Sequence, residues 1–213
     1  MRLHLLSLLA VPLTLQAADP QLPPGVEVGE KIYSIDPSAT SLDEANLKVL
    51  SKGETDIQVQ NGGIRITSLE ENPFLELREE ISGETVIRLA IQFDPTTNHF
   101  FRLSFFDVLG LEYNSQFKRF ALLEKTDRKP YAYEFNTVQQ KQGALDTFAV
   151  NPGEFVLTIA VTQAKVMVWC DDLQLFSFPL ENVDLSGLFR IRSGWHSNWA
   201  ITSLEIFKLK SIP

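Results

Sequence analysis

The stretch from Glu154 to Lys210 constrains the fold most, because it predicts five closely spaced β-strands with little between them but tight turns. The first three are FVLTIAV at 155–161, KVMVWC at 165–170 and LQLFSF at 173–178. Connections of two or three residues separate these partly alternating apolar runs, which is typical of antiparallel hairpins. This part of the chain is therefore expected to fold as β-structure alone.

Strands are also expected along the rest of the chain, at a spacing of roughly ten residues. They are Lys31 to Ile35, Asp56 to Gln60, Ile64 to Ser68, Phe74 to Arg78, Thr85 to Phe93, Phe100 to Phe106, Leu109 to Asn114, Phe117 to Leu123, Tyr131 to Phe135 and Ala144 to Val150. Asn61-Gly62-Gly63 separates two of these strands and predicts a hairpin turn, since Asn and Gly tolerate positive φ angles.

At most one short helix is expected, at Ser41 to Leu50, where Ser41 and Glu44 have the spacing of a capping box. Many strands at even spacing favour two packed antiparallel sheets over a parallel α/β fold. The predicted fold class is therefore all-β, a two-sheet antiparallel jelly-roll β-sandwich.

The N-terminal segment has the features of a secretory signal. Residues 1–18 combine Arg2, an apolar run from Leu5 to Leu15 and small residues at the end, and the run is too short to span a bilayer. A proline-rich extended leader at 19–29 and one β-sandwich domain at 30–213 are expected to follow. The sequence thus predicts a secreted or periplasmic protein with no transmembrane segment in its mature form.

Charge and cysteine content narrow the choice of partners and of stabilising forces. Without residues 1–18 the chain holds 18 basic and 27 acidic residues, a formal charge of −9, which disfavours nucleic acid and anionic membranes as partners. Cys170 is the one cysteine, so no internal disulfide can form. Its place beside Trp169 in an apolar strand predicts a small buried core residue rather than a reactive thiol.

Two C-terminal segments resemble a known family. VMVWCDDLQLF at 166–176 and GLFRIRSGWHSNWAITSLEIFKL at 187–209 are similar to the closing strands of concanavalin A-like lectin and glucanase domains, particularly the laminin-G-like domains of bacterial secreted proteins. Asp171 matches the turn aspartate of that family, and Asp172 replaces its turn glycine. Gly187 and Leu188 match the start of the next strand. These are structural positions, so the resemblance implies a concanavalin A-like sandwich and no particular activity.

No catalytic residue and no metal site is predicted. Glucanases of this fold carry paired carboxylates in a Glu-x-Asp-x-x-Glu pattern, and the nearest match, which begins at Glu54, has Val59 in place of the second glutamate. The sequence also lacks a Gly-x-Ser-x-Gly motif and clustered His and Cys ligands for zinc. Calcium is frequent in laminin-G-like domains, but Asp171, Asp172 and Asp184 have no calcium-loop spacing, so no cofactor is expected.

Seven residues are candidates for ligand binding. They are Trp195, His196, Asn198, Tyr113, Arg119, Glu76 and Arg78. The first three belong to a polar and aromatic loop, where rings can stack on sugar faces while polar groups bond to hydroxyls. Strand alternation places Glu76 and Arg78 on one face, which a solvated exterior also explains. Trp195 is equally compatible with a packed loop anchor, and Trp199 is expected in the core.

The leading prediction is a secreted, non-catalytic, lectin-like module that binds a glycan or another cell-surface ligand. A glycoside hydrolase or sugar-lyase relative of the same fold stays open. It predicts two carboxyl groups at catalytic separation, one of them with a raised pKa. A protein-interaction or assembly module also stays open, and it predicts a large exposed apolar patch.

Overall fold

The computed structural model describes residues 22–50, 55–68, 73–93, 100–117, 119–125, 135–142, 154–194 and 197–212. These residues form β-strands and turns, and no helix occurs among them. A helix long and apolar enough to cross a membrane is likewise not found among the described residues. The expected signal at 1–18, the first residues of the leader and the expected strand from Ala144 to Val150 lie outside the described residues. The same holds for the expected strand from Tyr131 to Phe135, apart from Phe135 itself.

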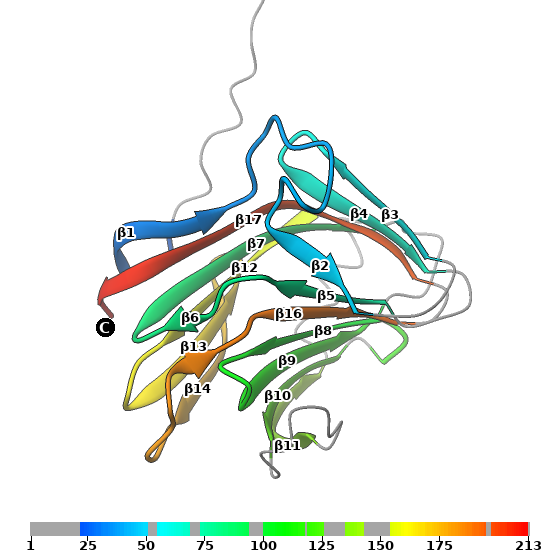
Figure 1. Ribbon diagram of the computed structural model, residues 1–213. Coiled ribbons are helices and arrows are strands. Elements are labelled where there is room, and N and C mark those ends of the chain that lie inside the picture. The colour runs from blue at the N-terminus through cyan, green and yellow to red at the C-terminus, as the bar shows by residue number, and fades with distance from the viewer. Residues whose placement is uncertain are drawn as a thin grey trace, which may run out of the picture.

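The strands form two large antiparallel sheets that face each other, and a short additional pair (Figure 1). The eight-stranded sheet has the order β14 (Leu173–Pro179), β13 (Lys165–Cys170), β12 (Glu154–Val161), β7 (Thr85–Phe93), β17 (Asn198–Ser211), β4 (Gly63–Ser68) and β3 (Thr55–Gln60), and β1 (Glu27–Ser34) also pairs with β17. The seven-stranded sheet has the order β11 (Phe135–Gln142), β10 (Arg119–Lys125), β9 (Leu109–Asn114), β8 (Phe100–Phe105), β16 (Arg190–Ser193), β5 (Phe74–Leu77) and β2 (Leu47–Val49). The short pair is β6 (Ile81–Ser82) with β15 (Ser186–Gly187). The predicted all-β, two-sheet jelly roll is confirmed.

The core lies between the two sheets and is built by alternation within strands. In β8 the side chains of Phe101, Leu103 and Phe105 are fully buried, while the residues between them point away from the core. Trp199 of β17 is 1 % exposed, its ring lies 5.2 Å from that of Phe101, and its Nε1 donates to Ser193 Oγ at 2.9 Å. The prediction that Trp199 belongs to the core is confirmed.

Cys170 is also a core residue, as predicted. It is fully buried at the end of β13, and this burial, together with the neighbouring Asp171 charge, raises the pKa of its thiol far above the ordinary value. A thiol that stays protonated is a poor nucleophile. Cys170 therefore contributes packing.

The predicted hairpin turns form where the sequence places them. Asn61 and Gly62 have φ angles of 52° and 73°, and they join Gln60 to Gly63 across the β3–β4 ladder. Positive φ at both central residues matches the twist of the flanking strands. Asp171 has a φ of 49° in the β13–β14 turn, and its carboxylate accepts a hydrogen bond from the backbone N of Val156 at 2.9 Å.

The sequence allowed at most one short helix, at Ser41 to Leu50, and the structure forms none there. The local capping signal is real, because the backbone N of Glu44 donates to Ser41 Oγ at 3.2 Å. Asn46 then takes a φ of 54°, which ends the turn, and the chain continues as β2 paired with β5. Leu47 is fully buried in that pairing. Burial of Leu47 in the sheet thus outweighs the local helical preference.

Candidate functional site

The side of the seven-stranded sheet that points away from the core carries a set of charged side chains, which we call the charged face. Its members are Lys48, Glu76, Arg102, Asp107, Glu112, Arg119, Arg190 and Arg192. Strand alternation creates this face, because the neighbours of these residues, such as Leu75, Phe101 and Ile191, point into the core. Antiparallel pairing then brings strands that are distant in sequence side by side.

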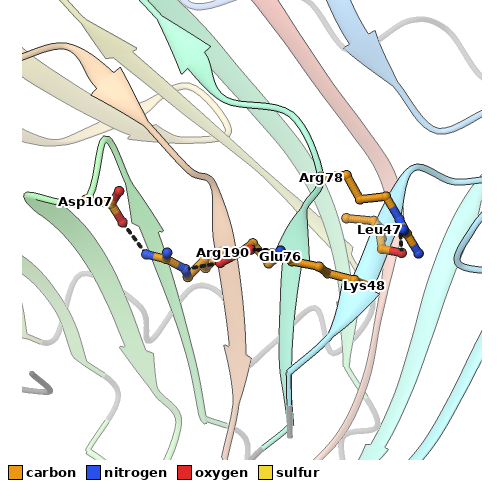
Figure 2. Close-up of polar contacts among 6 residues, drawn as sticks. All are labelled: Leu47, Lys48, Glu76, Arg78, Asp107 and Arg190. Atoms are coloured by element: carbon orange, nitrogen blue, oxygen red, sulfur yellow. Dashed lines mark hydrogen bonds and ion pairs between the residues drawn. The ribbon is translucent and has the colours of Figure 1, made fainter. Parts of the chain in front are cut away.

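Glu76 of β5 is the centre of the first cluster on this face (Figure 2). Lys48 Nζ lies 2.5 Å from Glu76 Oε1, and Arg190 Nε donates to Glu76 Oε2 at 2.5 Å. Arg190 also pairs through Nη1 with Asp107, so four side chains form one continuous row in Figure 2. Glu76 is only 3 % exposed, although it belongs to the outward side of the sheet.

The cluster keeps Glu76 and Arg190 ionised. Burial by itself raises the pKa of Glu76, but the hydrogen bonds and positive charges of Lys48 and Arg190 outweigh it and lower that pKa below the usual value. Burial lowers the pKa of Arg190, while hydrogen bonding and attraction to Glu76 and Asp107 raise it overall. Each buried charge is therefore compensated by an opposite charge, as a buried ion needs.

Asp107 reaches this cluster from a strained turn between β8 and β9. Phe106 and Asp107 both have a φ of 56°, a conformation that L-residues other than Asn and Asp seldom adopt. Each such residue costs about 1 kcal/mol or more of backbone strain. The buried ring of Phe106 and the ion pair from Asp107 to Arg190 offset that strain. The turn thereby fixes where Asp107 meets Arg190.

Glu112 of β9 is the centre of a second cluster. Arg102 Nη2 lies 2.6 Å from Glu112 Oε2, and Arg119 Nη2 lies 3.4 Å from Glu112 Oε1. Glu112 is 8 % exposed, whereas the side chains of Arg102 and Arg119 are 19 % and 30 % exposed. One buried carboxylate thus orients two partly exposed guanidinium groups.

Three arginines of the charged face each lie over a phenylalanine ring. The guanidinium carbon lies 5.3 Å from the ring centroid for Arg192 and Phe74, 5.7 Å for Arg119 and Phe117, and 5.9 Å for Arg102 and Phe100. These separations are within the range of cation–π attraction. Such a contact holds a guanidinium in place and leaves donor groups at its edge for other partners.

No family model matches the chain, and no curated protein matches it. Solved structures match its fold. A protein of unknown function with a galectin-like fold from Bacillus subtilis has a TM-score of 0.67 at 8 % identity, over 86 % of this chain and 98 % of that one. An endo-β-1,3-glucanase from Pyrococcus furiosus has a TM-score of 0.63 at 9 % identity, over 89 % and 100 %. The carbohydrate-binding module CBM66 from Bacillus subtilis has a TM-score of 0.54 at 10 % identity, over 79 % and 96 %.

The fold is concanavalin A-like. The resemblance seen in the two C-terminal segments is thereby confirmed at the level of the fold. Identities of 8 to 10 % establish the shared architecture alone, so the chemistry of the site has to come from the residues of this chain. In this concanavalin A-like sandwich, those residues are the members of the charged face.

The structure brings two of the sequence candidates, Glu76 and Arg119, to the charged face. Arg78 follows β5 but turns to other partners. Its Nε donates to the backbone O of Leu47 at 3.2 Å (Figure 2), and its Nη2 pairs with Asp43. Glu76 and Arg78 thus contact different residues, and Arg78 is not a member of the charged face.

The other candidates lie elsewhere. Tyr113 is 8 % exposed and faces the core, where its ring lies 4.8 Å from that of Phe120, and burial raises its pKa to about 12. Asn198 begins β17 opposite Thr67, in the eight-stranded sheet. Trp195 and His196 lie outside the described residues.

Sequence reasoning missed most of the charged face. The missed members are Lys48, Arg102, Asp107, Glu112, Arg190 and Arg192. A signal was present, because Arg190 and Arg192 alternate with apolar residues in FRIRS and must share one side of a strand. Arg102 in FFRLSF likewise stands between two apolar residues, so it must lie on the opposite side of the strand from them. Nothing local showed that these strands would be neighbours.

Metal ligands and a surface hollow are the other features of the described residues that bear on a binding site. No group of three or more His, Cys, Asp or Glu side chains in this part of the chain could hold a metal ion. A hollow of about 240 Å³ lies on the eight-stranded sheet, where Arg65, Gln92 and Thr202 contribute to its lining. Ligand pockets usually measure about 300 to 1,000 Å³. The charged face is therefore the stronger candidate.

Proposed function

We propose that this protein is an exported, non-catalytic carbohydrate-binding module that holds its glycan against the charged face of the seven-stranded sheet. The observation that carries the proposal is the way buried carboxylates fix arginines on an outward surface. Glu112 orients Arg102 and Arg119, and Glu76 orients Arg190, while each carboxylate stays nearly inaccessible. The guanidinium groups are thus positioned before any ligand arrives.

Such an arrangement suits sugars for two reasons. Fixed guanidinium donors can bond to sugar oxygens with little further loss of side-chain freedom, which improves affinity. Phenylalanine rings beside Arg102, Arg119 and Arg192 supply apolar surface for the faces of sugar rings. Structures that share this fold include a carbohydrate-binding module and a glucanase, and this supports a sugar ligand.

The hydrolase alternative receives less support from the site. A glycosidase needs one carboxyl group with a raised pKa, held about 5 to 9.5 Å from a second one. The pKa of Glu76 is lowered instead. Glu76 and Glu112 belong to strands separated by β16 and β8, which at about 4.8 Å per strand places their backbones roughly 14 Å apart. These two carboxylates are arranged to hold cations.

The interaction-module alternative predicts a contiguous apolar patch. The large apolar side chains that are exposed among the described residues are Val49, Leu50, Phe117 and Leu173. They come from the end of β2, the β9–β10 turn and the start of β14, so they are distributed over three parts of the fold. Scattered exposed apolar residues are normal on a soluble surface.

The test is a glycan array and a polysaccharide pull-down, with release of reducing ends assayed in the same tubes. We expect retention without release, and weaker retention of Arg102→Gln than of the unmodified protein. Arg65→Gln, on β4 of the other sheet, removes the same charge and serves as the control. Release of reducing ends would establish an enzyme. Loss of retention in Arg65→Gln alone would move the site to the hollow on the eight-stranded sheet.

A further inference from the structure

The hollow on the eight-stranded sheet is separate from the charged face, and strand register explains its shape. Ala200 of β17 pairs with Arg65 of β4 on one side and with Gln92 of β7 on the other, so the three residues form one row across the sheet. Because Ile64 and Trp199 are buried in the core, alternation directs the side chains of this row outward. A single methyl group thus lies between two long polar side chains, and this leaves the space of the hollow.

An interruption in the pairing of β17 extends the hollow. The register between β17 and β7 shifts between Ile201 and Ser203, so Thr202 is the extra residue of a bulge. Bulges of this kind are frequent beside functional sites. On the other side of β17, Gly63 ends the ladder with β4, and a Cβ at Gly63 would lie 2.5 Å from the backbone O of Ile201. The close approach of two backbones therefore fixes one wall of the hollow.

The lining of the hollow is polar and carries one charge. The polar side chains around it are those of Gln60, Asn61, Arg65, Gln92 and Thr202. Of the described residues in the lining, Arg65 alone can carry a charge. The side chains of Arg65 and of the three amide residues are exposed, and within the described part of the chain they make no hydrogen bond or ion pair. Their donors and acceptors are therefore available to a ligand.

The neighbouring acidic residues are engaged elsewhere. Asp56 is two residues from Gln58, the register partner of Arg65, but its carboxylate accepts a hydrogen bond from Gln58 Nε2 at 3.0 Å. Glu154 extends the row beyond Gln92, and it accepts a hydrogen bond from Thr202 Oγ1 at 2.7 Å. Three strand-to-strand steps of about 4.8 Å separate the backbones of Glu154 and Arg65 by roughly 14 Å. The guanidinium beside the hollow is thus left for an anion from solution.

From these observations we propose that the hollow is a second binding site, and that it takes a small hydroxy acid with a single carboxylate. This inference goes beyond the proposed binding of glycan by the charged face and does not depend on it. The planar guanidinium of Arg65 can donate two parallel hydrogen bonds to a carboxylate. Because the lining carries one charge, a ligand with one negative charge is matched by it, whereas a dicarboxylate or a phosphate would keep an unpaired charge.

The neutral groups and the size of the hollow define the rest of the ligand. Amide side chains both donate and accept hydrogen bonds, and the Thr202 hydroxyl keeps lone pairs that can accept one, so together they suit ligand hydroxyls. The volume of about 240 Å³ equals that of roughly eight water molecules at ~30 Å³ each, which excludes a chain of several sugars. The described lining also holds no aromatic ring on which a sugar could stack.

The first experiment compares small molecules that differ in one kind of group. Gluconate is compared with sorbitol, in which a hydroxymethyl group replaces the carboxylate, and glycerate with propionate, which lacks the hydroxyls. Each is titrated into isotope-labelled protein at low salt, and two-dimensional NMR of the backbone amides reports affinity and place. We expect gluconate to bind about tenfold or more tightly than sorbitol, the size of one charge-assisted contact, and glycerate to bind more tightly than propionate. The shifts should concentrate at Gly63 and Ala200 rather than at Glu112 and Arg190.

The second experiment compares variants of the hollow. Arg65→Gln should remove the preference for gluconate over sorbitol, and Arg65→Lys should restore part of it because the charge returns without the planar fork. Ala200→Leu should block gluconate by filling the hollow, although it changes no charge. Lys210→Gln is the matched control, since it removes the same charge from a 70 % exposed side chain at the far end of β17. The amide spectrum shows whether each variant is folded, and Arg65→Gln, at an exposed position, still tests the site if Ala200→Leu does not fold.

The outcomes each bear on a different part of the inference. Equal binding of gluconate and sorbitol would overturn the carboxylate, and equal binding of glycerate and propionate would overturn the hydroxy acid. Equal weakening in Arg65→Gln and Lys210→Gln would show general charge attraction and overturn the site, as would shifts confined to the charged face. No shift at about 50 mM of each acid would overturn it outright. Arg65 and Ala200 are not members of the charged face, so this inference and the proposed glycan binding can fail independently.

Discussion

The two sides of the seven-stranded sheet are made from the same strands but use opposite chemistry. On the core side of β8, Phe101, Leu103 and Phe105 are fully buried. On the outward side of the same strand, Arg102 keeps a 19 % exposed side chain. The outward side is nevertheless not exposed to solvent throughout, because Glu76 is 3 % exposed there and Glu112 is 8 % exposed.

The two sides therefore have different roles: the core side stabilises the fold, and the outward side carries the groups that a ligand can contact. Burial of an apolar side chain on the core side contributes in proportion to the area removed from water. Burial of an ion pair on the outward side contributes little, because the loss of hydration nearly cancels the attraction between the charges. The charged face is therefore expected to matter more for ligand binding than for stability.

The largest effect is expected on the core side. Phe101→Ala should lower the free energy of unfolding by about 3 to 5 kcal/mol, since it removes a fully buried ring and leaves a cavity. The neighbouring Arg102→Ala should cost about 1 kcal/mol or less, because Glu112 keeps Arg119 as a partner. Urea unfolding at pH 7 measures both. Similar losses for the two variants would remove the distinction between the two sides.

An intermediate effect is expected at Glu76. Glu76→Gln should lower the free energy of unfolding by roughly 2 to 3 kcal/mol, because Arg190 is left partly buried without its main counter-charge. The double variant Glu76→Leu with Arg190→Leu should recover much of this loss, since the charges that remain, on Lys48 and Asp107, are the more exposed ones. It should also bind glycan more weakly than the unmodified protein. A double variant no more stable than Glu76→Gln would mean that the pair itself is stabilising.

A smaller effect is expected at Cys170, on the core side of the eight-stranded sheet. Cys170→Ser should cost roughly 1 to 3 kcal/mol, because a hydroxyl replaces a thiol in an apolar setting. The native thiol should also resist iodoacetamide until the protein unfolds, since burial raises its pKa. Mass spectrometry after labelling with and without urea measures this. Rapid labelling of the folded protein would show that the core is open at this strand.

The smallest effect is expected from the titration of Glu76, on the outward side of the seven-stranded sheet. The pKa of Glu76 is lower in the folded protein than its ordinary value of about 4.3, so its contribution is fully present above that pH. The contribution is lost as pH falls through the lower pKa of the folded state. Urea unfolding from pH 7 to pH 3 should therefore show a shallower decline for Glu76→Gln than for the unmodified protein. Phe101→Ala, which changes no charge, should keep the original slope.

The sequence predicted the sheets well because alternation is a local property. The features that it predicted all involve residues close together in the chain. They are the apolar runs with period two, the tight turns at Asn61-Gly62 and Asp171-Asp172, and the apolar neighbours of Cys170. The one short helix that the sequence allowed, from Ser41, does not form for a non-local reason, since Leu47 gains more by pairing with β5 than by continuing a turn. Local sequence patterns contain no information about a partner strand that is distant in the chain.

The charged face was decided by the tertiary structure. Alternation in FRIRS already placed Arg190 and Arg192 on one side of a strand, but it could not say what they would meet there. Arg190 meets Glu76 across a sequence separation of 114 residues, and Arg102 meets Arg192 only because β16 inserts between β5 and β8. The period of a strand thus assigned each side chain to a face, whereas strand order and register determined which charges became neighbours.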